Sequence, residues 1–366
     1  MKVLFVLEYH YPHVGGVETL FKDLTENLVN HSYEVTVLTN LYDDELPRAE
    51  ILNGVNIIRV PFKNRYLFTL LAFFPAFRLA RKHDFIHSTS YNAAIPAFFA
   101  GFLARRRVFI TFHEVWGSLW FKLPYMSRIS KYLHFTFEWI LLKLPFYRFI
   151  AVSESTKSGL INHGINPQKV KMIYNGIDYQ EFKAYQNQNQ KSTEPFRFIY
   201  FGRLGISKGL DVLVEGAALC KQSGAFFELH MVIPSENTSF KNKILTAIKD
   251  NDIEDRVIIH HDLKRADLLA LISSSDATII PSYSEGFGFT AVESIAMDIP
   301  VISSGLGSLP EVVSGDHIYF SPYNGQGLAD SMNHALEGKW QHTPKKEFTL
   351  EDSVSHYVDL YQSIDN

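Results

Sequence analysis

Two glutamates flank a glycine-containing turn in the C-terminal half of the sequence. In the segment PSYSEGFGFTAVESIAMDIPVISS, Glu285 follows the apolar run ATIIPS, and Glu293 comes eight residues later. A carboxylate accepts hydrogen bonds without donating any, which suits the vicinal hydroxyls of a ribose or a hexose. The intervening turn, Gly286, Phe287 and Gly288, leaves room for a ligand against the backbone. A solvent-facing charge is the simpler interpretation of either glutamate alone, but the pair around this turn favours a sugar site.

Two basic residues, Arg203 and Lys208, stand close together in FGRLGISKGL, directly after the apolar run FRFIY. Arginine can bind two phosphate oxygens at once, lysine acts as a point charge, and the N-terminus of a following helix attracts the same anion. The segment therefore predicts a diphosphate site. A solvated loop that happens to contain two basic residues is the alternative.

A pair of glycines, Gly15 and Gly16, follows the first apolar run of the chain in HVGGVETL. Glycines at the start of a helix let backbone N–H groups approach an anionic ligand closely. A tight turn without a ligand is the simpler interpretation of the pair taken alone.

Apolar runs rich in β-branched residues alternate with segments of helical periodicity along both halves of the chain. The strand-like runs include KVLFVLE, YEVTVLTN, RVFITFH and RFIAVS in the first half, and FRFIYFG, FELHMVI, RVIIHH and ATIIPS in the second. This alternation predicts an α/β fold with two parallel sheets. Ligands of open parallel sheets bind beyond the carboxyl ends of the strands, which is where the candidate residues stand.

The polar segment AYQNQNQKSTEP, residues 184–195, interrupts the alternation. It is interpreted as a linker because it can bury little apolar surface. A chain of 366 residues also favours two domains over one. We therefore expect an N-terminal domain over residues 1–183 and a C-terminal domain over residues 195–349. The closing residues 350–366 predict a helix that folds back on the N-terminal domain, with one apolar stripe made by Val354, Tyr357, Leu360 and Tyr361.

The composition excludes several classes of protein. Apolar residues make up 46% and charged residues 20% of the chain, as expected for a well-buried globular protein. Cys220 is the only cysteine, which excludes an intrachain disulfide and favours a reducing, cytoplasmic location. The longest uncharged apolar stretches are shorter than the roughly 18 to 20 residues of a transmembrane helix, so none is expected. Neither half has the G-x-G-x-x-G turn of a dinucleotide-dependent oxidoreductase.

Positive charge is concentrated in one aromatic-rich block. Residues 61–150 contain 13 Lys or Arg but only 3 Asp or Glu, whereas the whole chain has a net charge of −4. Such a block suits an anionic membrane surface, with KYLHFTFEWILLKLPFYRF as the contact helix. Core helices with solvated basic faces explain the same composition, and the sequence does not separate the two interpretations.

Five segments resemble a known family: GRLGISKGL, YSEGFGFTAVESIAMDIPVIS, GSLPEVV, YNGID and GGVE. Together they are similar to the motifs of the retaining glycosyltransferases of family 4, and the similarity spans nearly the whole chain. The resemblance implies the GT-B architecture, in which two Rossmann-like domains face a central cleft. It implies a nucleotide-sugar donor bound mainly by the C-terminal domain and an acceptor bound by the N-terminal domain. It also implies that neither a cofactor nor a metal ion is required.

The resemblance implies a role for each candidate residue at the donor site. Arg203 and Lys208 are expected to hold the donor diphosphate and to stabilise the charge that develops on the leaving group. Glu293 is expected to bind ribose hydroxyls and Glu285 the hydroxyls of the sugar, while Gly16 lies close to the diphosphate. The other expected donor-binding residues are Gly15, Gly286, Phe287 and Gly288.

His113, in ITFHEVWG, matches the family histidine that lies near the transferred sugar. With Arg203, Lys208 and Glu285 it completes the expected catalytic set, although a core imidazole is the simpler interpretation of a lone histidine. The sequence departs from the family pattern at Met297-Asp298-Ile299, where a small pair of residues often precedes the proline. The departure touches none of the expected contacts, but it makes the identity of the donor harder to infer.

These observations predict a retaining enzyme that moves a hexose or an N-acetylhexosamine from a nucleotide-sugar, UDP-linked rather than GDP-linked. The expected acceptor is a glycan or a lipid-linked glycan in cell-surface polysaccharide or glycoconjugate assembly, at the inner face of the cell membrane. A UDP-sugar epimerase of the same fold and a non-catalytic membrane-surface binding protein are the alternatives. Nucleic acid is not an expected partner, because the chain outside the basic block is acidic.

Overall fold

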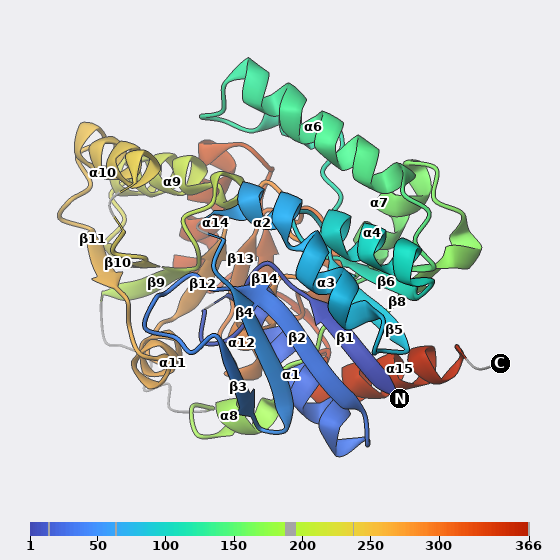
Figure 1. Ribbon diagram of the computed structural model, residues 1–366. Coiled ribbons are helices and arrows are strands. Elements are labelled where there is room, and N and C mark those ends of the chain that lie inside the picture. The colour runs from blue at the N-terminus through green and yellow to red at the C-terminus, as the bar shows by residue number, and fades with distance from the viewer. Residues whose placement is uncertain (14, 63, 187–194, 237, 365–366) are drawn as a thin grey trace. The chain divides into compact units, whose positions relative to one another are not determined.

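In the computed structural model the chain forms two compact units (Figure 1). The N-terminal unit comprises Met1–Phe121, Ser127–Gly176 and Thr349–Asn366, and the C-terminal unit comprises Lys122–Met126 and Ile177–Phe348. The structure describes residues 1–13, 15–62, 64–186, 195–236 and 238–364. Most of the predicted linker, residues 184–195, lies outside the described residues.

The N-terminal unit is built on one twisted sheet whose neighbouring strands are parallel, apart from an antiparallel pair at one edge. In the part of the chain that the structure describes, its spatial order is β3 (Ala49–Leu52), β4 (Val55–Val60), β2 (Glu34–Asn40), β1 (Lys2–Val6), β5 (Phe85–Thr89), β6 (Arg107–Phe112), β7 (Arg148–Ala151) and β8 (Val170–Met172). The edge pair β3 and β4 is a hairpin closed by Asn53 and Gly54, which both have positive φ angles, as a tight two-residue turn requires.

Helices cover both faces of this sheet. They are α1 (Gly16–Asn30), α2 (Arg65–Leu71), α3 (Phe73–Ala80), α4 (Ala94–Ala104), α5 (Leu119–Lys122), α6 (Arg128–Lys143), α7 (Glu154–Asn162) and α15 (Leu350–Gln362), with a 3₁₀ turn, η1, at Pro167–Lys169. Alternate side chains of a strand point to opposite faces, so β1 supplies both halves of the core. Leu4 and Val6 join the cluster beneath α3 and α4, whereas Phe5 packs its ring against Phe21 of α1.

The C-terminal helix α15 belongs to the N-terminal unit. Its predicted apolar stripe is buried, and Tyr361 packs against Phe85 and Phe109 of the sheet. The Tyr361 hydroxyl also contacts Nδ1 of the buried His87 at 2.5 Å. Helix α15 therefore completes the core on the α1 face of the sheet.

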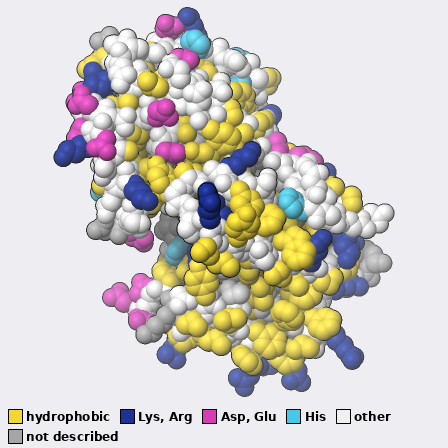
Figure 2. Space-filling model, turned by 90° about the horizontal axis from the view of Figure 1, so that it is seen from above, with side chains coloured by type: hydrophobic (Ala, Val, Ile, Leu, Met, Phe, Trp, Pro, Cys, Tyr) yellow, Lys and Arg dark blue, Asp and Glu magenta, His cyan; other side chains and the backbone are white. Residues whose placement is uncertain are grey.

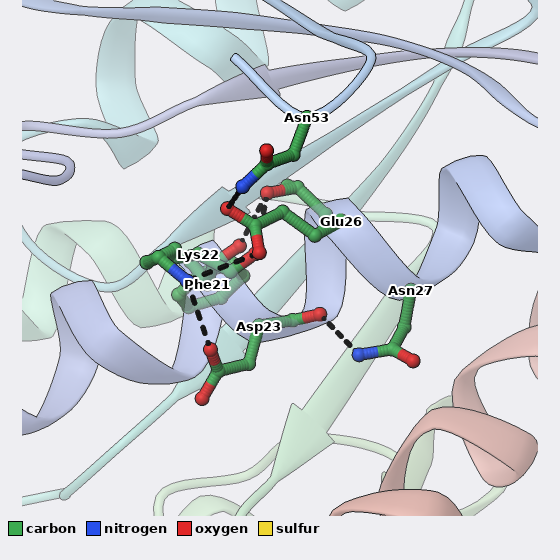
Figure 3. A network of polar contacts seen from close by, with 7 residues as sticks. Phe21, Lys22, Asp23, Glu26, Asn27 and Asn53 are labelled. Carbon is green, nitrogen blue, oxygen red and sulfur yellow. Dashed lines mark hydrogen bonds and ion pairs between the residues drawn. The ribbon is translucent and has the colours of Figure 1, made fainter.

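A polar network ties helix α1 to the β3–β4 hairpin (Figure 3). The Asn53 amide donates a hydrogen bond of 2.9 Å to Oε1 of Glu26, and the other oxygen of that carboxylate pairs with Lys22 at 3.0 Å. The Asn27 amide donates to the carbonyl of Asp23 one helical turn earlier. These contacts fix the helix whose first turn carries the predicted glycine site.

The C-terminal unit repeats the architecture. Within the described residues its sheet has the order β11 (Val257–His261), β10 (Phe227–Ile233), β9 (Phe196–Phe201), β12 (Ala277–Ile280), β13 (Val301–Ser303), β14 (Gly315–Tyr319) and β15 (Gln341–Thr343), and only β15 runs antiparallel. Its helices are α8 (Tyr179–Lys183), α9 (Leu210–Gln222), α10 (Ser239–Asp250), α11 (Arg265–Ser273), α12 (Phe289–Ala296), α13 (Leu309–Val312) and α14 (Gly325–Leu336), and Ile206–Lys208 forms a 3₁₀ turn, η2. The predicted α/β class with two parallel sheets is confirmed.

Helix α8 lies in the C-terminal unit, whereas the expected N-terminal domain of residues 1–183 included it. The reason is local packing. The Phe182 side chain is buried beneath the guanidinium of Arg265, and Glu181 forms two hydrogen bonds with that guanidinium.

Among the described helices, none combines the length and the apolar character that crossing a membrane requires.

Candidate functional site

An ion pair joins the loops that follow the neighbouring strands β9 and β12. The Lys208 ammonium lies 2.7 Å from Oε1 of Glu285, and the Ser282 hydroxyl donates a hydrogen bond of 2.6 Å to the same oxygen. The Glu285 side chain is only 10% exposed. Both loops leave the carboxyl edge of the same parallel sheet, which is where ligands of such sheets bind.

Backbone contacts hold these two loops together. The Tyr283 N–H donates a hydrogen bond of 2.7 Å to the carbonyl of Ser207. Gly209 has a φ of +65°, and a Cβ there would collide with the carbonyl oxygen of Pro281. Only glycine fits where the loop of Lys208 turns into helix α9 against the end of β12.

The backbone of Glu285 is fixed from a third loop, which follows β13. Both the N–H and the hydroxyl of Ser308 donate hydrogen bonds of 3.0 Å to the Glu285 carbonyl. Gly307 has a φ of +63°, and a Cβ there would overlap the Glu285 backbone. The motif GSLPEVV therefore positions Glu285 by close backbone contact.

Glu293 lies on α12 and pairs with a residue that the sequence analysis did not select. Nη2 of Arg265 lies 2.9 Å from Oε1 of Glu293, and the same guanidinium binds Glu181 through two hydrogen bonds. Burial raises the pKa of Glu293, and the charge of Arg265 opposes that rise. Arg265 therefore keeps a carboxylate available where ribose hydroxyls are expected. A positive side chain at the first residue of the helix beginning RADLLALIS was the available signal.

The remaining predicted residues of the C-terminal unit differ in exposure. Arg203 is exposed, and its carbonyl accepts a hydrogen bond of 3.3 Å from the Tyr200 hydroxyl. Gly286 and Gly288 flank Phe287 just before α12, and Gly288 has a φ of +90°. The Phe287 side chain is buried and packs against Phe348, so the ring holds the turn in place.

In the N-terminal unit, His113 directly follows β6. Its ring is half-buried and packs edge-to-face against Phe21 of α1, with 6.0 Å between ring centroids. The Thr156 hydroxyl at the start of α7 donates a hydrogen bond of 3.3 Å to the His113 carbonyl. Helices α1 and α7 thus both contribute to holding this histidine at the carboxyl edge of the sheet.

The predicted glycine site lies at the beginning of α1. Gly16 is the first residue of the helix, and Gly15 precedes it in an extended conformation. A Cβ on Gly15 would collide with the buried carboxylate of Glu18 in the first turn of the helix. Phe21 of the same helix touches His113, so the two predicted sites of the N-terminal unit lie on adjoining elements.

The loop after His113 is held by a buried carboxylate that the sequence analysis missed. Glu138 of α6 is 1% exposed and accepts hydrogen bonds from the backbone N–H groups of Trp116 and Gly117 at 2.8 and 2.7 Å. It also accepts from the Trp120 indole at 3.1 Å and from the Tyr91 hydroxyl at 2.8 Å. An acidic residue inside the aromatic helix segment was the only signal in the sequence.

The arrangement can bind a charged, hydroxyl-rich ligand. In the C-terminal unit two cations, Lys208 and Arg265, and two carboxylates lie in the segments that follow the strands, which suits an anion next to sugar hydroxyls. Across the described ranges, no group of three His, Cys, Asp or Glu side chains could hold a metal ion.

Two family models match the chain. The model described as Glycosyltransferase Family 4 matches residues 14–181, and the model described as Glycosyl transferases group 1 matches residues 181–347. The chain belongs to the group 1 glycosyltransferases of family 4. It is therefore a hexosyltransferase-type enzyme, as the sequence motifs predicted.

Known relatives agree with this assignment. The GPI3 subunit of phosphatidylinositol N-acetylglucosaminyltransferase from Saccharomyces cerevisiae is 21% identical over 99% of this chain and 83% of its own length. Sucrose-phosphate synthase from Thermosynechococcus elongatus has the same fold, with a TM-score of 0.79, 20% identity and coverage of 99% of this chain and 98% of that one. Anabaena HepE, solved with UDP-glucose, gives a TM-score of 0.77 at 20% identity, covering 99% of this chain and 100% of that one. The GT-B architecture is thereby confirmed.

Proposed function

We propose that this glycosyltransferase moves a hexose or an N-acetylhexosamine from a UDP-sugar to a glycan on a membrane lipid, with retention of the anomeric configuration. The observation that carries the proposal is the Lys208–Glu285 pair, because it sets a cation directly beside a buried hydroxyl acceptor. A sugar diphosphate presents the two complementary groups side by side, a phosphate anion for the cation and ring hydroxyls for the acceptor.

In this proposal the charged residues of the candidate donor site have three tasks. Lys208 and Arg203 bind the diphosphate and stabilise the negative charge that grows on it as the anomeric bond breaks. Glu285 accepts hydrogen bonds from hydroxyls of the transferred sugar. Glu293, held by Arg265, accepts hydrogen bonds from the ribose hydroxyls.

One relative supports UDP as the nucleotide, because HepE was solved with UDP-glucose. The GPI3 subunit is named for the transfer of N-acetylglucosamine, which supports the sugar. Retention of configuration is what the resemblance to family 4 implies. We further propose that the enzyme needs no metal ion, because Lys208 and Arg203 supply the positive charge that the leaving diphosphate requires.

A lipid-linked acceptor is supported by an apolar face on the N-terminal unit. We define this apolar face by the exposed large hydrophobic side chains of α2, α3, α4 and α6, which are Tyr66, Leu67, Leu70, Leu71, Phe74, Phe99, Phe102, Leu103, Ile129, Tyr132, Leu133, Trp139 and Ile140. Figure 2 shows a broad area of hydrophobic side chains with Lys and Arg side chains along its edge. Contiguous apolar area of this kind marks an interaction site.

The charges around the apolar face favour a membrane over a protein partner. The exposed basic residues of the same helices and the segments of the N-terminal unit next to them include Arg65, Arg78, Arg81, Lys82, Arg105, Arg128 and Lys143. Aromatic and aliphatic side chains that enter the interface, together with cations that meet anionic headgroups, are the features of a peripheral membrane surface. We therefore propose that the enzyme works at a membrane surface, and the single cysteine of the chain favours the cytoplasmic side.

The test is nucleoside-diphosphate release from UDP-, GDP- and ADP-sugars, with and without a membrane-lipid extract. We expect release from a UDP-sugar that rises with the extract and is lost in Glu285→Ala. Glu254→Ala, which removes an exposed carboxylate of the same unit, is the matched control and should behave as the wild type. The anomeric configuration of the product, read by NMR, tests retention. A folded enzyme that releases no UDP under any condition would refute the proposal.

A further inference from the structure

Glu138 accepts a hydrogen bond at each of four positions around its carboxylate. Oε1 accepts from the Trp116 N–H and the Tyr91 hydroxyl, and Oε2 accepts from the Gly117 N–H and the Trp120 indole. A carboxylate is the side chain that can accept four hydrogen bonds while donating none. A glutamine of the same shape would turn an NH₂ group toward two of these donors.

These contacts determine the path of the loop that begins at His113. The loop leaves β6 at Phe112, and Glu138 fixes its backbone three and four residues after the histidine. Trp116 and Trp120 also stack on each other at 4.5 Å, and Trp120 packs against His134 of α6 at 4.8 Å. Helix α6 therefore holds the loop from one side, while Phe21 contacts the His113 ring from α1.

The same helix carries part of the apolar face. Ile129, Leu133 and Ile140 are exposed, whereas Glu138 and Leu141 point inward. The side of α6 proposed to meet the membrane and the side that holds the loop thus belong to one rigid element. A shift of α6 would move the backbone of the loop through the Glu138 carboxylate.

We propose that Glu138 is a positioning residue for glycosyl transfer, which fixes the His113 loop from the helix that docks on the membrane. This inference rests on the proposed function and on the role that the family resemblance implies for His113, near the transferred sugar. Glu138 acts through the loop and touches no substrate. Its removal is therefore expected to lower kcat by misplacing His113, while donor binding by the C-terminal unit stays nearly intact.

The experiment compares Glu138→Gln with the wild type in three measurements. The first is kcat and the donor KM with a detergent-dispersed acceptor. The second is tryptophan emission in a background that carries Trp139→Phe and Trp340→Phe, so that only the stacked pair Trp116 and Trp120 reports. The third is the fraction of folded protein. Tyr91→Phe removes one of the four donors, and Glu34→Gln, which changes an exposed carboxylate of the same unit, is the control.

We expect Glu138→Gln to lower kcat by roughly 10- to 100-fold, with a donor KM within about threefold of the wild type and a shifted emission. Tyr91→Phe should lower kcat by only a few fold, and Glu34→Gln should change nothing. A Glu138→Gln enzyme with wild-type kcat would overturn the inference and leave the proposed function standing. A loss of kcat that only matches a loss of folded protein would also overturn it. Failure of the wild type itself to transfer sugar would instead defeat the proposed function, and this inference with it.

Discussion

The Lys208 ammonium and the Glu285 carboxylate form a close ion pair that links the loops after β9 and β12. The pair neutralises both charges while no donor is bound. Under the proposed function, a donor diphosphate would replace the carboxylate partner of Lys208 with a doubly charged one, and the Ser282 hydroxyl would stay on Glu285. In that proposal the ammonium is preorganised at the position where leaving-group charge would develop, which is the condition for electrostatic catalysis.

Replacing Lys208 with methionine keeps the apolar stem and removes the charge. We expect kcat to fall by about 10²- to 10³-fold, because one preorganised donor to the developing charge is lost. Steady-state kinetics with the identified donor checks this. Lys249→Met, on the exposed end of α10, is the control. Near-normal kcat in Lys208→Met would show that the charge is stabilised elsewhere.

Replacing Arg265 with methionine leaves the buried carboxyl of Glu293 without its cation. Burial already raises the pKa of Glu293, so removing Arg265 raises it further and favours the protonated form. A protonated carboxyl is a poorer acceptor for ribose hydroxyls, and the donor KM should therefore rise more at pH 6 than at pH 8. We expect an increase of about tenfold at the lower pH, with kcat little changed. A KM increase that is independent of pH would argue that Arg265 contributes only packing.

Membrane docking by the apolar face is tested by Ile129→Ser combined with Leu133→Ser on α6. Both side chains are exposed, so the unit should fold normally. Sedimentation with anionic vesicles should fall by roughly tenfold, because two aliphatic side chains lose their place in the interface. Ile51→Ser on the edge strand β3 changes an equally exposed residue away from these helices and serves as the control. Wild-type binding that depends on neither lipid charge nor salt concentration would contradict a role for the exposed basic residues around the apolar face.

Metal independence is tested by chelation. With EDTA in excess, we expect UDP release from the preferred donor to continue at the untreated rate, because we propose that Lys208 and Arg203 supply the positive charge at the diphosphate. Added Mg²⁺ or Mn²⁺ should not raise the rate of the chelated enzyme. Activity that disappears with EDTA and returns with one of these ions would reverse the proposal.

Acid should destabilise the N-terminal unit through His87. Burial lowers the pKa of His87 to about 3, with a smaller effect of the nearby His113, whereas the unfolded chain binds a proton near pH 6.5. The contribution of His87 to the free energy of unfolding is thus fully present above pH 6.5 and is lost as the pH falls toward 3. The loss is about 2 kcal/mol at pH 5. Urea unfolding at pH 7.5 and pH 5 measures this difference.

His87→Gln should shrink that difference, whereas His31→Gln, at an exposed site, should leave it unchanged. The difference will not vanish, because burial also lowers the pKa of His10, to about 4. An unchanged difference in His87→Gln would assign the acid sensitivity to other groups.

The parts of the site that follow from sheet geometry could be predicted from the sequence. Lys208 and Glu285 are 77 residues apart, yet each follows an apolar run that forms a strand, and neighbouring parallel strands end at one edge. The apolar stripe of α15 could also be predicted, because the residues of a buried helical face recur every three or four positions.

The partners of charged side chains could not be predicted. Arg265 meets Glu181, 84 residues away, and Glu138 meets the backbone of Gly117, 21 residues away. Periodicity indicates which positions face inward but not which polar groups meet there. The turn of Gly286, Phe287 and Gly288 was expected to leave room for a ligand. The sequence did not indicate that the Phe287 ring packs against Phe348.

The N-terminal unit cannot complete its core until helix α15, the last helix in the chain order, has been synthesised. Tyr357 and Tyr361 fill the core against β5 and β6, so this core stays open until the ribosome has made and released the segment that follows the whole C-terminal unit. The C-terminal unit, by contrast, draws all but Lys122–Met126 from one continuous stretch of chain. During translation the C-terminal unit can therefore reach its native form first, and a nascent chain stalled before residue 350 would expose Phe85 and Phe109 of the N-terminal unit to chaperones.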